Sequence, residues 1–217
     1  MGSKHKNVSH RRYGASRPYH TRPTLPVVTV VCDDTRTAVA YFTELKREVK
    51  AKVTVNVKPA PRCGATSDDV RAHAVKLAKS REREETETND STWVLLDLET
   101  EGNRQAQAQQ AQKSGAGKGV HVLLSKPCYE VWTLAHLIDT GEAFNNCAAV
   151  VDRIKTEWKK KFRTGFGSKK GQADYGKLMP LRDTAVQNAK RRSPERDPSW
   201  TEVFKVVEAI ASLCSVT

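Results

Sequence analysis

The chain has 217 residues, 38% of them hydrophobic, and a formal net charge of +12. This length accommodates one α/β domain with extensions, and a charge of this sign attracts polyanions, chiefly nucleic acid. No apolar stretch approaches the roughly 18 residues of a membrane span, and the basic N-terminus lacks a hydrophobic signal core, so we expect a cytoplasmic protein.

The first elements in the chain follow a basic, low-complexity start. Residues 1–26 are rich in Arg, His, Ser and Pro and are expected to form a disordered basic arm. Residues 27–32 (VVTVVC) are a continuous β-branched run, which is typical of a strand buried on both faces. Apolar spacing then predicts a helix over 38–49, a strand over 53–57 and a helix over 68–79.

The middle of the chain repeats this alternation. Residues 92–96 (TWVLL) predict a second buried strand, and 104–113, rich in Ala and Gln, predict a helix. Residues 120–124 (VHVLL) predict another strand. Ser125 as an N-cap and Pro127 in the first turn predict a helix that continues to about residue 140.

The order of these elements is βαβαβαβα, which predicts a mostly parallel, Toprim- or Rossmann-like sheet with helices on both faces. Helices are also expected over 148–162, 178–192 and 199–214, with a loop rich in Gly and Lys over 165–176. The expected organisation is an arm at 1–26, an α/β domain at 27–145 and a basic helical C-terminal extension at 146–217.

The positive charge is concentrated in two segments that flank a nearly neutral middle. Residues 150–196 hold fourteen Lys and Arg against five acids, and residues 1–26 hold six and none. A field of this kind attracts nucleic acid, although a solvated helix face is an equal alternative. The residues predicted to contact phosphates are Lys159, Lys160, Lys161, Arg163, Lys169, Lys170, Arg191 and Arg192.

Acidic residues follow two of the predicted strands at the point where each strand ends. Asp33 and Asp34 follow the first strand, and Asp97 and Glu99 follow the third. Sites in open parallel sheets form at this edge, and carboxylates gathered there repel one another unless a cation lies between them. Their hard oxygen ligands suit Mg²⁺ or Mn²⁺. Asp34 has an alternative role as a helix cap.

The five cysteines are odd in number and include no C-x-x-C pair. This pattern argues against a disulfide framework and against a zinc ribbon. Cys32 and Cys128 lie in apolar runs, and we expect both to be buried thiols.

Several segments together resemble one known family. Residues 31–42 (VCDDTRTAVAYF) are similar to V-C-E-G-x-x-T-E-x-x-Y-F, the opening motif of the RloB-like family. Residues 93–99 (WVLLDLE) resemble its strand ending in D-x-D, and 125–136 (SKPCYEVWTLAH) closely resemble its S-N-P-C-F-E-x-W-x-x-x-H segment. Residues 174–177 (DYGK) are similar to its Y-x-K element, and 198–210 to its C-terminal helix.

The resemblance spans about residues 27–212 and implies a Toprim-like fold related to the nuclease half of OLD-type proteins. It also implies a role in bacterial antiphage defence, including abortive infection, often beside an ABC-like ATPase. Carried over by position, Asp33 becomes a general acid/base or metal ligand, and Asp97 and Glu99 hold Mg²⁺. The sequence departs from the family pattern because Asp33 replaces Glu, Asp34 replaces Gly and Glu99 replaces Asp.

Three further candidates come from the same segments. Glu130 could turn toward the metal cluster or bind backbone N–H groups, and Lys177 matches the Y-x-K element; both are predicted catalytic residues. His136 has two alternatives, a catalytic role or a structural contact with Asp139, three residues further along the helix.

The favoured function is therefore a metal-dependent endonuclease, a hydrolase that acts on DNA or RNA, tRNA included. The alternative is a non-catalytic nucleic-acid-binding or sensor subunit that partners an ABC-like ATPase. A Rossmann-type small-molecule enzyme is disfavoured, because residues 32–35 after the first strand contain no glycine and so lack the dinucleotide-binding fingerprint.

Overall fold

The computed structural model describes residues 25–34, 36–61, 65–82, 90–98, 104–116, 119–167 and 173–216. The predicted basic arm therefore lies outside the described residues except for its last two. The strands are β1 (Val27–Cys32), β2 (Thr54–Lys58), β3 (Ser91–Asp97), β4 (Val120–Lys126) and β5 (Trp200–Thr201). The helices are α1 (Thr37–Val49), α2 (Ser67–Glu82), α3 (Arg104–Ala116), α4 (Glu130–Ala135), α5 (Cys147–Phe162), the 3₁₀ helix η1 (Tyr175–Leu181), α6 (Arg182–Lys190) and α7 (Phe204–Val216).

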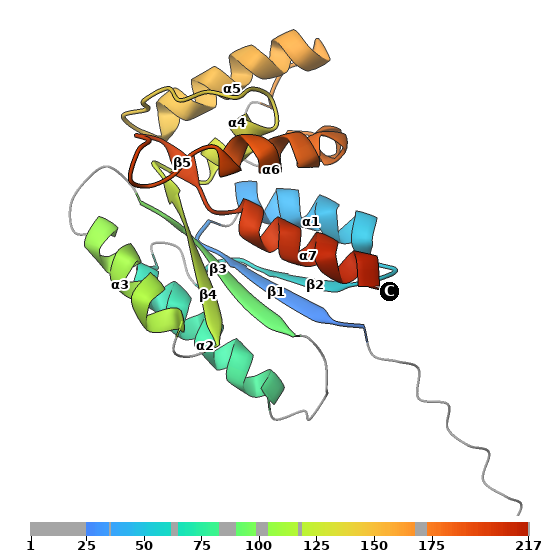
Figure 1. Cartoon of the computed structure of the whole chain (residues 1–217), viewed down its shortest axis with the longest axis vertical. Helices are drawn as coiled ribbons and strands as arrows, with labels where there is room; N and C mark the ends of the chain where they lie inside the picture. Colours follow the sequence, from blue (N-terminus) through green and yellow to red (C-terminus); the bar gives the residue numbers. More distant parts are fainter. Residues whose placement is uncertain are drawn as a thin grey trace, which may run out of the picture.

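The five strands form one sheet in the order β2-β1-β3-β4-β5. The pairs β1–β2, β1–β3 and β3–β4 are parallel, and β5 joins β4 in the antiparallel sense. Helices α2 and α3 cover one face of the sheet, and α1 and α7 cover the other (Figure 1). The predicted α/β class, with a mostly parallel Toprim- or Rossmann-like sheet and helices on both faces, is confirmed.

Side chains of each central strand alternate between two hydrophobic cores. Val28 and Val30 of β1 belong to the core beneath α1 and α7, and Val31 belongs to the core beneath α2 and α3. All three are fully buried. Burial on both faces explains why this strand is a continuous apolar run, as parallel strands between helix layers require.

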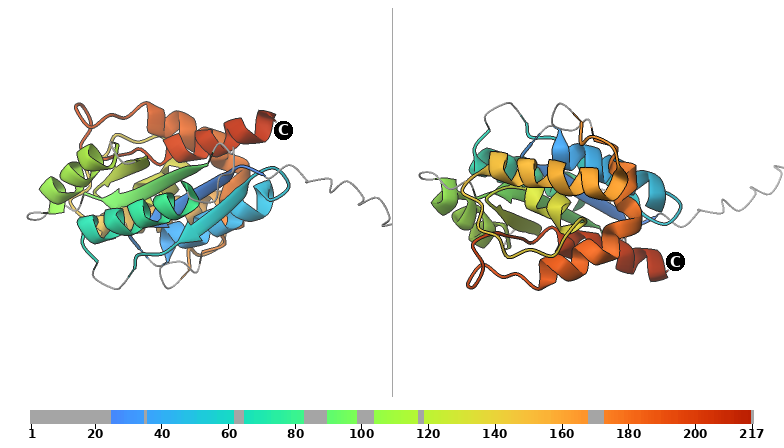
Figure 2. Two further views of the ribbon diagram at one scale, coloured as in Figure 1. Left: turned by 90° about the horizontal axis from the view of Figure 1, so that it is seen from below. Right: turned by 90° about the horizontal axis from the view of Figure 1, so that it is seen from above.

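Helices α4, α5 and α6 form a group beyond the carboxyl end of β4, at the top of Figure 1 and toward the viewer in the right-hand view of Figure 2. Trp158 of α5, Ala185 of α6 and Ile210 of α7 are buried in the same core as Val30 of β1. A third cluster joins Leu134 of α4 to α5. The C-terminal helices therefore complete the hydrophobic core of the sheet.

The segment after β4 differs from the prediction. Ser125 and Lys126 continue the strand, and α4 begins only at Glu130 and ends at Ala135. The Ser125 hydroxyl shares a hydrogen bond with Thr201 of β5, 2.7 Å away, so its predicted role as an N-cap is wrong. The competing partner is distant in the sequence, which is why local pattern alone assigned Ser125 to a helix start.

The C-terminal segment also contains a strand that the sequence pattern did not predict. Trp200 and Thr201 form β5, and α7 starts at Phe204 rather than near 199. Glu202 fixes this segment to β4, because its backbone N–H donates to Leu124 O and its carboxylate accepts from the Leu124 N–H, 2.9 and 3.0 Å. Within the described residues, no helix combines the length and apolar character that a membrane crossing needs.

Candidate functional site

The acids after β1 and β3 lie at the same edge of the sheet. The two strands pair in parallel with Cys32 opposite Leu95, and the Asp33 N–H donates to Leu95 O, 3.1 Å. Asp33 thus directly follows β1, and Asp97 is the last residue of β3. Helix α1 leaves β1 toward one face, whereas α3 follows β3 on the other face. Ligands of open α/β sheets bind at such a point of divergence.

Asp97 is held in a negatively charged environment. Its Oδ1 accepts a hydrogen bond from the Tyr129 N–H, 2.8 Å, and the residue is half-buried. Burial raises the pKa of Asp97 well above its usual value, and the charges of Glu130 and Asp33 raise it further. Acids from three separate segments therefore repel one another here, as the sequence analysis expected for this edge.

Asp34 has the local role that the sequence left as its alternative. Its carboxylate accepts hydrogen bonds from the N–H groups of Thr37 and Ala38, 2.7 and 3.3 Å, at the start of α1. Burial raises its pKa, those backbone hydrogen bonds lower it, and the charge of Glu130 raises it. Asp34 therefore caps α1, and this fixes the chain that immediately follows Asp33.

Glu130 connects the acid edge to the helices above it. It is the first residue of α4, is only 3% exposed, and its Oε1 accepts a hydrogen bond from the Thr37 hydroxyl, 3.2 Å. A buried carboxylate at a helix start benefits from the positive end of the helix dipole. The prediction that Glu130 turns toward the cluster agrees with this position, since its charge acts on both Asp97 and Asp34.

Tyr175 is a site residue that the sequence analysis missed. It is 2% exposed and interacts with the Thr37 side chain. Burial raises the pKa of Tyr175, followed by the charges of Glu130 and Asp34, so the hydroxyl stays protonated. The sequence signal for Tyr175 was the Y-x-K element at 174–177, from which only Lys177 was predicted as a catalytic residue.

A pocket of about 420 Å³ opens beside Glu130. It lies between the starts of α1, α4 and α5, the loop after α5, and η1. The residues that line it include Thr37, Glu130, Cys147, Lys155, Phe166 and Tyr175. The Tyr175 side chain and the buried Glu130 carboxylate thus border one cavity.

Asp33, Asp97 and Glu130 do not meet in a group of ligand atoms as tight as 4.8 Å. Within the described residues, one group of three ligand atoms lies within 4.8 Å of one another, and it consists of Cys128, Glu130 and Cys147. Asp33 and Asp97 are not part of that group. Glu99, the third predicted metal ligand, lies outside the described residues, so its place relative to Asp97 stays a prediction.

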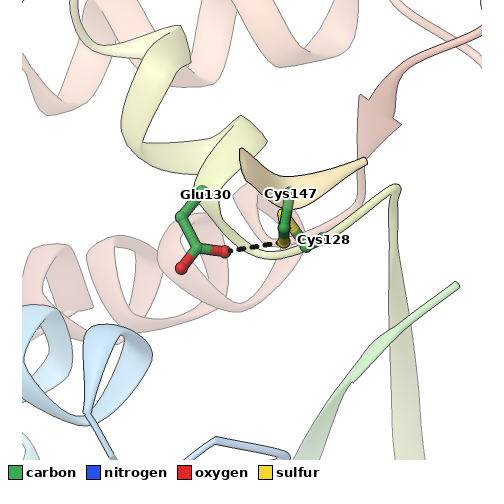
Figure 3. A group of neighbouring side chains, drawn as sticks. All are labelled: Cys128, Glu130 and Cys147. Carbon is green, nitrogen blue, oxygen red and sulfur yellow. Dashed lines mark hydrogen bonds between the residues drawn. A yellow bond between two sulfur atoms is a disulfide. The ribbon is translucent and has the colours of Figure 1, made fainter. Parts of the chain in front are cut away.

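Cys128 and Cys147 form a disulfide, with their Cα atoms 5.8 Å apart (Figure 3). Cys128 is buried as expected, but it is not a free thiol, so that part of the expectation is wrong. The two residues are 19 apart in the sequence and do not stand in a C-x-x-C pair, so the spacing gave no signal. Cys32 is a buried free thiol, as predicted.

Lys177 and His136 contact residues other than the acids. The Lys177 ammonium donates to the Thr164 hydroxyl, 3.2 Å, and lies 5.7 Å from the centre of the Phe162 ring. His136 is fully buried, and its Nδ1 lies 2.9 Å from Trp132 O. Burial lowers the pKa of His136 to about 4, so the ring is neutral. Its predicted contact with Asp139 is wrong.

The predicted phosphate-binding residues fall into three groups. Lys159, Lys160, Lys161 and Arg163 are exposed at the end of α5, where Lys160 also pairs with Glu157, 2.8 Å. Lys169 and Lys170 lie outside the described residues. Arg191 and Arg192 both form ion pairs with Asp139 at 2.6 Å, so their charges are already engaged in tying the end of α6 to the segment after α4.

A comparison with protein families identifies the family. The model of the RloB-like protein family matches residues 28–210, which covers the five strands except Val27, and the acid edge. No curated protein and no solved structure matches the chain. The match covers most of the sequence, and the chain therefore belongs to the RloB-like protein family.

Proposed function

We propose that this protein is a metal-dependent nuclease that hydrolyses phosphodiester bonds in DNA or RNA. Asp33, Asp97 and Glu99 would hold Mg²⁺ or Mn²⁺. The observation that carries the proposal is the placement of Asp33 and Asp97 at the neighbouring ends of β1 and β3, where the pKa of Asp97 is also raised. Perturbed carboxyl groups at such a position are typical of functional sites.

The side chains of this edge fit a hard divalent cation. Asp33, Asp97 and Glu130 offer only oxygen ligands, which Mg²⁺ and Mn²⁺ prefer. Gathering their charges in a half-buried place costs free energy unless a cation or a proton compensates it. A bound metal ion would polarise the phosphate and lower the pKa of an attacking water.

The chain's own groups have separate tasks in this proposal. The Tyr129 N–H fixes one oxygen of Asp97, and the cap by Asp34 fixes the start of α1. The protonated Tyr175 hydroxyl can donate a hydrogen bond to a phosphate oxygen in the pocket. The exposed lysines at the end of α5 would bind neighbouring phosphates of the strand.

The direct test uses the purified chain with tRNA, single-stranded DNA and duplex DNA. We expect cleavage of at least one substrate in Mg²⁺ or Mn²⁺ and none in EDTA, with loss of cleavage but not of binding in Asp33→Asn. Equal cleavage by the wild type and this variant would contradict the assignment of the site.

A second function has its own support in the exposed basic end of α5 and in the altered acids of the opening motif. In that case the protein binds nucleic acid without cutting it and acts as the sensor of a defence system beside an ABC-like ATPase. Strong, salt-sensitive binding by the wild type, without cleavage in any metal, would favour this function over the first.

Both functions predict that the end of α5 contacts phosphates. The double variant Lys159→Ala/Lys161→Ala should weaken nucleic-acid binding. It should also make the slope of the logarithm of the binding constant against the logarithm of salt concentration shallower, by about 0.9 for each lost duplex phosphate contact. Fluorescence anisotropy at several salt concentrations measures both quantities.

The matched control is Lys76→Ala/Lys79→Ala, which removes two exposed lysines from α2 on the other face of the sheet. This variant should keep the wild-type slope. If both double variants weaken binding to the same degree, the protein has no localised phosphate track on α5.

A further inference from the structure

Cys128, Glu130 and Cys147 form a compact group that shares Glu130 with the acid edge. Cys128 lies just before α4, Glu130 starts α4, and Cys147 starts α5. One ligand atom of each lies within 4.8 Å of the other two, and all three side chains point toward one another (Figure 3). Cys128 and Glu130 are buried, and Cys147 is half-buried where it lines the pocket.

Cys147 also contacts Glu130 directly. Its sulfur lies 3.4 Å from Glu130 Oε2. A disulfide sulfur carries no hydrogen to donate, so in the oxidised state two electron-rich atoms face each other in a buried place. A thiol would turn this contact into a hydrogen bond, and a cation between the two atoms would turn it into a shared ligation.

We propose that the reduced group binds Zn²⁺ through the thiolates of Cys128 and Cys147 and the Oε2 of Glu130. Thiolate ligands at about 2.3 Å and a carboxylate at about 2.1 Å place the ligand atoms of a tetrahedral zinc site roughly 3.5–3.8 Å apart. The two sulfurs, which are bonded in the disulfide, must move apart, and each already lies within 4.8 Å of a Glu130 oxygen. Soft thiolates select zinc over the Mg²⁺ or Mn²⁺ of the carboxylate edge.

The position of Cys147 allows this movement. It is the first residue of α5 and borders the pocket of about 420 Å³, so its side chain can rotate toward open space while Cys128 stays in place. The fourth coordination position then faces the pocket, where water or an anionic oxygen can occupy it. The other oxygen of Glu130 keeps its hydrogen bond with Thr37.

The change between the two states is a two-electron step. A dithiol reductant transfers two electrons and two protons to the disulfide and becomes a disulfide itself, which leaves two protein thiols. Zinc then binds as both thiols release their protons. This site goes beyond the nuclease proposal and does not depend on it, because zinc binding is measured without any substrate.

The experiment uses the full chain, reduced with dithiothreitol, freed of metal and reductant under nitrogen, and titrated with Co²⁺ and then Zn²⁺. We expect one Co²⁺ per chain with thiolate-to-cobalt charge-transfer absorption, and displacement of that ion by Zn²⁺. The signal should be absent in the oxidised protein and in Cys147→Ser, and Glu130→Gln should weaken binding about tenfold or more.

The matched control is Cys214→Ser, which removes a half-buried free cysteine of α7 and should leave the signal intact. Circular dichroism shows whether each variant is folded. Zinc should also raise the melting temperature of the reduced wild type but not of Cys147→Ser. Absence of the cobalt signal in the folded, reduced wild type, or its survival in Cys147→Ser, would overturn the site.

Discussion

Asp97→Asn is expected to abolish metal-dependent cleavage, by roughly 100-fold or more, while it stabilises the metal-free protein. The amide oxygen can still accept the hydrogen bond of the Tyr129 N–H, so the local structure is retained. The substitution removes only the negative charge, and with it a metal ligand and the repulsion from Glu130 and Asp33.

The raised pKa of Asp97 determines whether the stability of the folded protein rises or falls with pH. The folded-state pKa of Asp97 is raised above its ordinary 3.8, so the folded protein binds that proton more tightly than the unfolded chain does. Wild-type stability is therefore fully present below the ordinary pKa and falls as pH rises through the raised one. The asparagine variant lacks this loss and should be more stable at neutral pH by on the order of 1 kcal/mol in EDTA.

Urea unfolding at acidic and neutral pH, with and without metal, measures these effects beside the cleavage assay. Asp183→Asn is the control, because this side chain is 97% exposed on α6 and should change neither quantity. An Asp97→Asn protein that keeps wild-type cleavage, or that is less stable than the wild type in EDTA, would contradict the assignment.

Trp132→Ala is expected to cause the largest loss of stability, about 3–5 kcal/mol. Trp132 is fully buried in α4 and makes edge-to-face contacts with Tyr41 of α1 and with His136, at ring-centre distances of 6.0 and 4.8 Å. Its removal leaves a cavity at the junction of α1 and α4, the two helices that position the acids.

The free energy of unfolding from urea titration measures this loss. The same substitution at Trp93 is the control, since Trp93 is half-buried and stacks on the exposed His121. We expect a clearly smaller loss there. An equal or larger loss at Trp93 would mean that the α1–α4 junction is not the main support of the fold.

Much of the sheet could be predicted because its signals are local. The run VVTVVC at 27–32 can only be buried on both faces, and the acids that follow it mark the carboxyl end of a parallel strand. The same argument applies to Asp97 at the end of β3. Both acids therefore reached one edge in the structure as their positions in the sequence required.

The remaining features depend on partners far apart in the sequence. Ser125 has the residue type of a helix cap, but a hydrogen bond to Thr201 keeps it in β4. Arg191 and Arg192 appear as free basic residues in the sequence, yet both pair with Asp139. Such pairings are decided by tertiary packing, which local pattern and charge do not encode.

The acids at this edge could be expected from the sequence, whereas the neutral groups beside them could not. A carboxylate after a strand is a recognisable signal, whereas a tyrosine gives none until folding buries its hydroxyl beside other charges. Tyr175 is such a case, since it lines the pocket beside Glu130. The pairing of Cys128 with Cys147 likewise becomes visible only when α4 and α5 are packed together.

The proposed nuclease activity requires a divalent cation bound between the ends of β1 and β3. Electron paramagnetic resonance of Mn²⁺ titrated into the oxidised protein, in which the cysteines cannot ligate, counts the bound ion. We predict one Mn²⁺ per chain in the wild type and in Cys147→Ser, and at least tenfold weaker binding in Asp33→Asn and Asp97→Asn. Unchanged Mn²⁺ affinity in both aspartate variants, or no Mn²⁺ binding by the wild type, would contradict it.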